Sequence, residues 1–527
     1  MIAGVLSSGV LGIDGFKVVV ECEVGGGLNS FEVVGLPETS VKESRVRIRA
    51  AMTSAGLEFP TRRIIVNLAP ADIPKRGTIY DLPMALAIAA AAELIPAQRL
   101  ERVLVLGELS LCGALRPLQG VLPMALAARQ MGVQRMLLPR DNAAEAAAVE
   151  GIEAYGVQDL TEALDWVTGR LPLAPEEPRQ EGPGPLRFPD MAEVRGQAFA
   201  KEALVVAAAG GHNILMVGPP GSGKTMLARR LPGILPAMTR DERLDATRIH
   251  SVSGLLPKGS GLMQQRPFRA PHHTLSHAAM VGGGGFPRPG EVSLAHCGVL
   301  FLDEFPEYPR QVLEALRQPL EDGHILISRA KMSCPFPSRF MLVAAMNPCP
   351  CGYRGSTQRD CVCGELSVQR YLARLSGPIL DRIDLHVVLQ AVGIEHLEAT
   401  RGDLDSATLQ GRVEEARRRQ QRRLWGSPAT CNAGMTPDQV RSLARPDREA
   451  RRLLHEVFVR RGMSARSYDR ILKLALTIAD LEGRDAIGAE ELARALRYRM
   501  LDGVLETGDG PTQGVQVGAL ASNGGEA

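Results

Sequence analysis

The sequence predicts an α/β protein of several domains, with a parallel-sheet core followed by a helical region. Three observations carry this prediction. The chain has 527 residues, which is more than one hydrophobic core accommodates. Apolar β-branched runs alternate with alanine-rich stretches as far as about residue 390, which is typical of sheets covered by helices. Beyond that point the apolar residues recur with helical spacing.

Composition excludes several classes of protein. The formal net charge is +2, so any affinity for nucleic acid must come from local basic patches such as residues 416–423. No apolar run reaches the ~18–20 residues that span a bilayer. Residues 1–17 lack the basic start and the cleavage site of a signal peptide. We therefore expect a cytoplasmic protein with no membrane partner.

The chain divides by composition into five segments. They are an α/β domain at 1–170, a linker rich in Pro, Gly and charge at 171–190, a second α/β domain at 191–390, a helical domain at 391–503, and a small polar tail at 504–527. We expect the tail to be disordered. In the helical domain Thr436 can cap a helix, with Pro437 in the first turn and Gln439 completing a capping box.

The second α/β domain contains a phosphate-binding loop between an apolar strand and a helix. Its residues are Gly218, Pro219, Pro220, Gly221, Ser222, Gly223, Lys224 and Thr225. The glycines let backbone N–H groups turn towards phosphates, and the helix N-terminus adds its positive end. Lys224 is expected to reach the β- and γ-phosphates of ATP, and Thr225 to bind Mg²⁺. The alternative is a glycine turn without a ligand.

Hydrolysis needs acidic and polar groups as well, and later apolar strands supply them. Residues 298–302 lead into Asp303, which can hold Mg²⁺ through water, and Glu304, which can polarise the attacking water. The alternative is a solvated acidic turn. Residues 341–346 lead into Asn347, whose amide can bond the γ-phosphate or the lytic water; otherwise it caps a turn.

Two arginines complete the predicted hydrolytic set. Arg382 precedes another apolar strand and can stabilise transition-state charge on the nucleotide of a neighbouring subunit, as an arginine finger. The alternative is a surface ion pair with Asp381 or Asp384. In the helical domain Arg466, with Arg470 one turn later, is expected to contact phosphate in its own chain; the alternative is a solvated helix start.

Four of the nine cysteines lie together, as Cys349, Cys351, Cys361 and Cys363. An odd cysteine count with one tight cluster argues against a disulfide framework. Two thiolate pairs on one loop can close a tetrahedral zinc site, although C-x-C is less common than C-x-x-C. We therefore predict structural Zn²⁺; the alternatives are free surface thiols or redox-labile pairs.

The ordered set from phosphate loop to helical lid is the signature of AAA+ ATPases. Residues 194–230, 266–304 and 375–386 resemble the magnesium chelatase-like branch, and with the N-terminal block they are similar to the ComM/YifB family of competence proteins. The resemblance covers the chain to about residue 503. It implies a homohexameric ring in which the finger acts in trans, with Val194 and Gln197 near the adenine.

The resemblance also suggests how the ring meets DNA. Residues 323–336 are predicted to form a hairpin with Arg329 and Lys331 at its tip. In this branch such a hairpin projects into the channel, where six copies would form a positive collar suited to phosphate backbones. The histidines at 250, 272, 273, 277 and 296 include a run with metal-ligand spacing, but the resemblance favours an inserted element facing the pore.

The N-terminal domain resembles the Lon-protease type. Residues 74–91 are similar to the nucleophile segment of Lon and residues 111–145 to the segment that holds its lysine. Here Ile79, or at best Thr78, stands where Lon has its serine, and the second segment contains no lysine. An activated nucleophile needs its base, so we expect a proteolytically inactive scaffold.

The resemblance to the family implies an ATP-dependent DNA helicase and branch-migration motor that promotes homologous recombination during natural transformation. Such a motor would grip branched or single-stranded DNA without reading its bases. The alternative with the same core is a magnesium chelatase-type motor that drives metal insertion. An ATP-dependent protease and an ATP-gated platform are two further alternatives.

Overall fold

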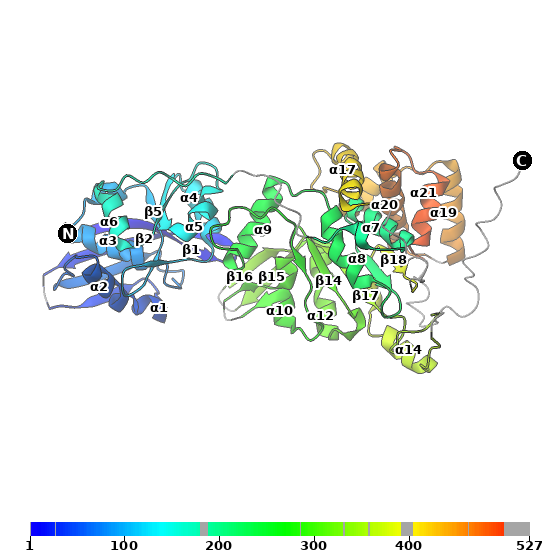
Figure 1. The fold of residues 1–527 in the computed structure, drawn as a ribbon, viewed down its shortest axis with the longest axis horizontal. Helices are drawn as coiled ribbons and strands as arrows, with labels where there is room; N and C mark the ends of the chain where they lie inside the picture. The colour runs from blue at the N-terminus through cyan, green and yellow to red at the C-terminus, as the bar shows by residue number, and fades with distance from the viewer. Residues whose placement is uncertain are drawn as a thin grey trace, which may run out of the picture.

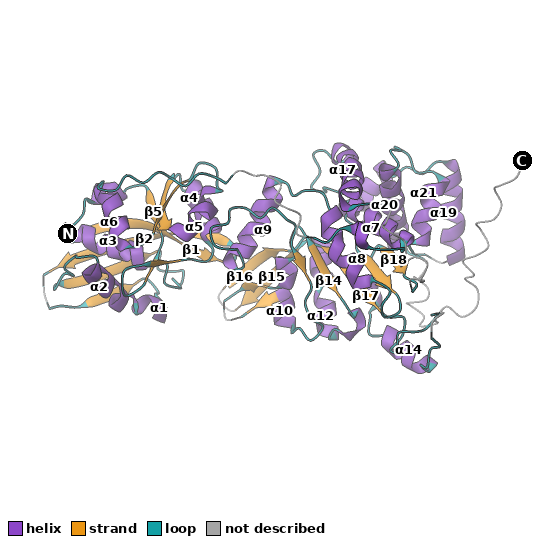
Figure 2. Ribbon diagram, in the orientation of Figure 1, coloured by secondary structure: helices purple, strands orange, loops and turns teal. Residues whose placement is uncertain are grey.

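The computed structural model describes residues 2–26, 28–179, 188–284, 286–329, 332–356, 359–391, 404–461 and 463–499. They form an N-terminal α/β unit, a central parallel-sheet unit and a C-terminal helical unit, which follow one another along the molecule (Figure 1). Figure 2 shows strands concentrated in the first two units and helices in the third. The boundaries given above stay predictions, and the tail at 504–527 lies outside the described residues.

A seven-stranded mixed sheet organises the N-terminal unit, in the order β3-β4-β2-β1-β5-β8-β9. Its long hairpin joins β1 to β2 through the turn at Gly12 and Ile13. Alternate residues of β2 are buried, as expected for a strand with one face on the core. The strands of this unit are β1 Ile2–Leu11, β2 Asp14–Gly25, β3 Phe31–Val34, β4 Arg63–Ala69, β5 Val103–Val105, β6 Glu108–Leu109, β7 Leu115–Arg116, β8 Arg135–Pro139 and β9 Glu153–Val157. Its helices are α1 Thr39–Lys42, α2 Ser44–Ser54, α3 Asp81–Ala91, α4 Val121–Gln130, α5 Arg140–Ala147 and α6 Leu160–Thr168.

The central unit is a parallel sheet in the order β11-β14-β17-β10-β18. Every residue of β10, β14 and β17 is buried, which explains the uninterrupted apolar runs in the sequence. Successive residues of β10 enter different cores, Ile214 on one face and Leu215 on the other. The strands are β10 Ile214–Val217, β11 Phe268–Arg269, β12 Gly282–Gly283, β13 Arg288–Pro289, β14 Val299–Leu302, β15 His324–Arg329, β16 Met332–Pro337, β17 Met341–Met346 and β18 Leu385–Val388. The helices are α7 Ala198–Gly210, α8 Lys224–Arg230, α9 Arg240–Val252, α10 His277–Val281, α11 Glu291–Leu294, α12 Arg310–Ala315, α13 Arg317–Asp322, α14 Glu365–Leu372 and α15 Gly377–Leu380.

The predicted hairpin is present as the antiparallel pair β15 and β16. Lys331 lies outside the described residues, and of Arg329 only the backbone is described. The hairpin packs against the N-terminal unit, because Ile13 shares a core with Cys334 and Phe336. A Cβ on Gly12 would lie 3.2 Å from the Cβ of Cys334, so the turn between β1 and β2 rests directly on β16.

A second contact joins the N-terminal and central units. Ser251, in α9, donates a hydrogen bond of 2.5 Å to the buried carboxylate of Glu145 in α5, which also accepts one from the backbone N–H of Leu122. The backbone N–H of Gly120 donates to the carbonyl of Ser251. Burial raises the pKa of Glu145, and these donors partly offset that effect. The two units are therefore joined by satisfied polar contacts as well as by apolar packing.

The C-terminal unit is helical, as the sequence predicts. Its helices are α17 Ser406–Arg423, α18 Pro437–Leu443, α19 Arg448–Arg461, α20 Ala465–Leu481 and α21 Ala489–Arg497. Thr436 and Gln439 form the predicted capping box of α18. Helices α18 and α19 are separated at Pro446, because proline lacks the N–H that would continue the first helix. None of the described helices is both long and apolar enough to cross a membrane.

Candidate nucleotide site and cysteine cluster

The phosphate loop takes the conformation that its glycines predict. Gly221 and Gly223 have φ angles of +75° and +90°, which residues with a Cβ rarely adopt. Nothing lies within 4 Å of a Cβ placed on either residue, so the backbone conformation is what requires glycine there. Gly218 is required for a different reason, the close approach of another segment, since a Cβ would lie 2.8 Å from the carbonyl oxygen of Leu389.

Lys224 is buried at the centre of this loop. Its ammonium donates to the carbonyl oxygens of Gly218 at 2.7 Å and Pro219 at 2.9 Å. It also donates to Oδ1 of Asn347 at 3.2 Å, which joins the loop to the end of β17. Burial lowers the pKa of Lys224, and the negative charge of Asp303 opposes that shift. The cation is thus held where a phosphate would be bound.

Thr225 and Asp303 form the second part of the site. The hydroxyl of Thr225 donates to Oδ2 of Asp303 at 2.7 Å, and the backbone N–H of Glu304 donates to Oδ1 at 3.0 Å. A hydroxyl beside a carboxylate is the oxygen donor set that Mg²⁺ prefers. The residues present therefore fit a magnesium ion.

Glu304 follows Asp303 but faces a different partner. Its φ is +52°, which is uncommon for a residue with a side chain. Its carboxylate pairs with Nδ1 of His273 at 3.0 Å. Among the described residues, it makes no hydrogen bond to the phosphate loop. Sequence reasoning missed His273 in this role, because its partner lies 31 positions further along the chain.

Of the two residues predicted to lie near the adenine, Gln197 contacts the phosphate loop. Val194 is buried in the core that packs against α7. Gln197 has a φ of +56°, and its amide donates to the carbonyl oxygens of Ser222 at 3.1 Å and Gln390 at 2.7 Å. Gln197 therefore fastens the segment before α7 to the phosphate loop. Contact with adenine stays a prediction.

Arg382 lies at the opposite edge of the sheet from the phosphate loop of its own chain. It precedes β18, which runs parallel to β10, and its carbonyl accepts from the side chain of Asn213 just before β10. The four residues of β10 span about 13 Å. Its guanidinium pairs with Glu321 and donates to the carbonyl of Pro378 at 2.6 Å.

Arg466 is exposed at the beginning of α20, on the same edge as Arg382. Arg382 holds the pKa of Glu321 below its usual value, and the charge of Arg466 adds to that effect. Arg470, one turn later, lies 3.7 Å from both Asp381 and Asp384, the acids considered above as partners for Arg382. This placement does not fit a contact between Arg466 and a phosphate in its own chain.

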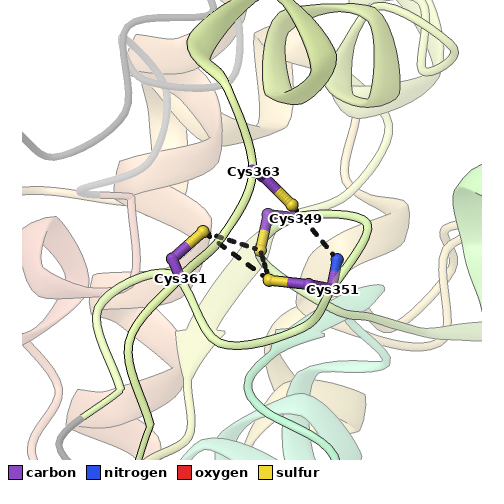
Figure 3. Close-up of side chains that lie close together, drawn as sticks. All are labelled: Cys349, Cys351, Cys361 and Cys363. Carbon is purple, nitrogen blue, oxygen red and sulfur yellow. Dashed lines mark hydrogen bonds between the residues drawn. The ribbon is translucent and has the colours of Figure 1, made fainter.

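The four cysteines converge after β17, as Figure 3 shows. All four sulfurs lie within 4.8 Å of one another. Cys349 Sγ is 3.4 Å from Cys351 Sγ and 3.6 Å from Cys361 Sγ. The edges of a ZnS₄ tetrahedron with Zn–S bonds of about 2.3 Å measure about 3.8 Å. The geometry and the thiol donor set therefore fit a zinc ion.

Backbone N–H groups surround this cluster. The N–H of Cys351 donates to Cys363 Sγ and that of Arg354 to Cys349 Sγ, each at 3.4 Å. Backbone donors, first that of Tyr353, lower the pKa of Cys351 to about 6, whereas burial and the neighbouring thiols raise the pKa of Cys361 to about 12 and also raise that of Cys363. Arg354 also forms a bidentate pair with Glu365, fixing the loop to α14. Among the described residues, these cysteines are the only group of possible ligands that lie close enough together to hold a metal ion.

The cysteine loop touches the nucleotide site directly. Gly352 has a φ of +86°, and a Cβ there would lie 2.7 Å from Cδ of Pro220 in the phosphate loop and 3.7 Å from Cγ of Asn347. The cysteine loop therefore packs against Pro220 and Asn347, two of the predicted site residues.

The histidines serve separate structural roles. His250 and His296 are buried, where their rings bond the carbonyl of Leu294 and the N–H of Arg339. The rings of His272 and His273 are in contact, with centroids 4.1 Å apart and planes tilted by 34°. The histidines therefore do not form the metal site that the spacing around residue 272 allows.

The two residues at the Lon-like nucleophile position have different surroundings. Ile79 packs against two apolar cores, and the hydroxyl of Thr78 donates to Glu108. An apolar side chain cannot attack a peptide bond. Ile79 therefore supplies no nucleophile, and a proteolytically inactive unit stays a prediction.

Comparison with known proteins agrees with this arrangement. Family models match three regions: Subunit ChlI of Mg-chelatase at 20–142, Magnesium chelatase, subunit ChlI at 190–397, and its C-terminal region at 403–499. The chain is 42% identical to Competence protein ComM of Haemophilus influenzae, over 96% of this chain and 99% of that protein. It is 41% identical to YifB of Escherichia coli, over 94% and 96% respectively. Lon protease 2 of Bacillus subtilis is 30% identical over 24% of this chain and 23% of its own length.

The contact between Gly352 and Pro220 gives a first prediction. Gly352→Ala should lower nucleotide affinity, because the new methyl group must displace the phosphate loop. Gly355→Ala is the matched control: its φ is +74°, but its Cβ would meet nothing within 4 Å. Both variants should lose about 1 kcal/mol of stability from the positive φ. Titration with a fluorescent ATP analogue and thermal unfolding measure the two effects. Equal affinities in the two variants would contradict the proposed support.

Proposed function

Because the chain belongs to the ComM/YifB family of magnesium chelatase-like AAA+ proteins, we propose that it is an ATP-hydrolysing homohexameric motor acting on DNA in the cytoplasm. The observation that carries the proposal is the convergence of Lys224, Asn347 and the pair Thr225–Asp303 at one edge of the sheet. A lysine, an oxygen donor set for Mg²⁺ and an amide at one place are the groups that phosphoryl transfer requires.

The chemistry follows from these side chains. Lys224 exchanges its two carbonyl partners for the β- and γ-phosphates, and Asn347 orients the γ-phosphate or the water. Thr225 and Asp303 would hold Mg²⁺, which when bound would supply positive charge beside the phosphates. Glu304 polarises the attacking water. Val194 and Gln197 border the adenine.

The arginines are proposed to act between subunits. The length of β10, about 13 Å, separates Arg382 from the phosphate loop of its own chain. Arg382 therefore completes the nucleotide pocket of a neighbouring subunit. Arg466 accompanies it, since both influence Glu321. Glu321 then keeps the guanidinium of Arg382 in an ion pair until the nucleotide of a neighbouring subunit binds. The phosphates of that nucleotide carry a higher charge and compete with Glu321 for the guanidinium.

The work of the motor is proposed to be helicase and branch-migration activity on branched or single-stranded DNA, promoting recombination in natural transformation. The printed name of the relative ComM supports the link to competence. Arg329 and Lys331 would contact phosphates, which carry no sequence information. The names of the matching family models favour a second candidate, a motor for metal insertion into a porphyrin.

One experiment separates these functions. We expect wild-type ATPase activity to rise with single-stranded or branched DNA. Labelled junctions should be converted to their branch-migration products only when ATP is present. Lys224→Ala should abolish turnover, and Glu304→Gln should slow it by about 10²–10⁴-fold while ATP stays bound. An ATPase that is indifferent to DNA and moves no strand would favour the second candidate. Normal hydrolysis by Glu304→Gln would show that the catalytic assignment is wrong.

The finger is tested by mixing two inactive variants. Arg382→Ala should reduce turnover by about 10³–10⁵-fold. Adding Lys224→Ala subunits should restore part of it, because mixed rings contain interfaces with an intact pocket and an intact finger. Arg374→Ala is the control, since Arg374 pairs with Glu307 at the surface. A full rate for Arg382→Ala as an isolated monomer would contradict the ring mechanism.

Zinc is proposed to occupy the cysteine cluster as a structural ion. Metal analysis should find one zinc per chain, and Cys349→Ser with Cys361→Ser should remove it. Nucleotide affinity should fall in the same variant, because the loop contacts Pro220. Cys112→Ser, which changes an exposed cysteine in another unit, should keep both zinc and affinity. A protein free of zinc with unchanged nucleotide binding would refute the assignment.

A further inference from the structure

The basic run at 416–423 lies on α17 and takes no part in the nucleotide site. The structure divides its five arginines into two groups. Three of them fasten the helix to its surroundings: Arg417 donates to the carbonyl of Ala208 at 3.0 Å, Arg419 pairs with Asp485 at 3.2 Å, and Arg423 pairs with the buried carboxylate of Asp480. The other two, Arg418 and Arg422, are exposed to solvent.

The two exposed arginines lie on the outer face of an amphipathic helix. The inner face of α17 carries Leu409, Val413 and Ala416, which belong to the apolar core shared with α7 and α20. Arg418 and Arg422 are four residues apart, so they lie on one side of the helix about 5–6 Å from each other. Arg418 pairs with Glu415 one turn earlier, whereas Arg422 forms no ion pair among the described residues. Figure 1 shows α17 over α7, apart from the β15–β16 hairpin.

Trp425 directly follows this helix and is 91% exposed. The N–H of Ser427 donates to the carbonyl of Leu424 at 2.9 Å, which makes Trp425 and Gly426 the central residues of a turn; Gly426 has a φ of +78°. Leu424 is buried in the core, and the hydroxyl of Ser427 accepts a hydrogen bond of 2.7 Å from the side chain of Gln439. The turn is therefore anchored on both sides and holds the indole in solvent.

The surroundings of the indole indicate which kind of partner covers it. Between residues 406 and 425 no other large apolar side chain is exposed. A helix that lies on a membrane or in the groove of a protein presents several such side chains at helical spacing. A lone aromatic ring beside arginines instead matches a nucleic acid, which offers the flat face of a base next to phosphates. In a duplex these faces are covered by the neighbouring bases, so the strand must be single.

Resting on the proposed function, we propose that Trp425, Arg422 and Arg418 form a binding site for single-stranded nucleic acid, separate from the β15–β16 hairpin. The indole stacks on one unpaired base, and the two guanidiniums contact phosphates on either side of it. The site reads no sequence, because every base has such a face. In a branch-migration motor it would hold a strand that the motor has displaced.

Intrinsic fluorescence tests the stacking in the full-length protein. The chain has two tryptophans, and the other, Trp166, lies against Tyr155 in the N-terminal unit with ring centroids 4.9 Å apart. In Trp166→Phe the indole emission reports Trp425 alone, and we expect oligothymidylate to quench it to saturation without ATP. Trp425→Phe keeps only Trp166 and should show no quenching. Unquenched emission from Trp166→Phe with the oligonucleotide bound would overturn the stacking.

Binding of a labelled oligothymidylate, followed by anisotropy, measures each contribution. Trp425→Ala should weaken binding by about 5- to 150-fold, the factor that one stack of a base on an aromatic ring carries, and Trp425→Phe should recover most of it. Arg422→Ala should lower the slope of log affinity against log salt by about 0.7, the loss of one phosphate contact. Arg452→Ala, which removes an exposed arginine from α19, is the matched control and should keep the wild-type slope. Oligouridylate in parallel assigns the site to DNA, to RNA or to both, by which strand shows the loss.

Wild-type affinity in Trp425→Ala would overturn the site. If that variant also fails to assemble like wild type in light scattering, the indole contacts a second copy of the chain instead. These outcomes differ from failure of the proposed function. If DNA leaves the wild-type ATPase rate unchanged but Trp425→Ala weakens oligonucleotide binding, the site stands and the motor does not. If DNA stimulates the ATPase and Trp425→Ala binds like wild type, the inference is wrong while the motor stands.

Discussion

The parallel pairing of β10, β14 and β17 is the constraint on which the rest of the structure depends. Parallel strands end at one edge of a sheet, so whatever follows them in sequence meets in space. Three buried strands deliver the phosphate loop, Asp303 and Asn347 to that edge. Residues up to 130 positions apart in sequence become neighbours because the register of the sheet is fixed by apolar side chains on both faces.

The same sheet separates the two halves of the proposed reaction. Strand β18 pairs with β10 in parallel, so the residues before it lie at the amino-terminal edge, with Arg382 among them. A chain organised in this way can bind a nucleotide at one edge and offer a cation at the other. It cannot bring the two together, because about 13 Å of strand intervenes. Within the proposed function, this topology requires Arg382 to act on the nucleotide of a neighbouring subunit.

Much of this could be predicted from the sequence, because short-range rules govern it. Apolar runs ending in Gly218, Asp303 and Asn347 predict strand ends, and the Thr436–Gln439 box predicts a helix start; the structure confirms both. The cysteine spacing predicts a cluster, and the four sulfurs converge. Two side-chain pairs could not be predicted, because they form between elements that are distant in sequence: His273 with Glu304, and Glu321 with Arg382. Such contacts depend on how elements pack, and exposed acids and histidines give no periodic signal.

The position of the hairpin extends this argument to the N-terminal unit. The turn at Gly12 and Ile13 rests on Cys334 and Phe336 of β16, whereas the other strand, β15, closely approaches Gly282 of β12, where a Cβ would lie 2.7 Å from Cδ1 of Ile327. The hairpin is thus held between the Lon-like unit and the segment at Gly282. The N-terminal unit therefore helps to set the position of the hairpin.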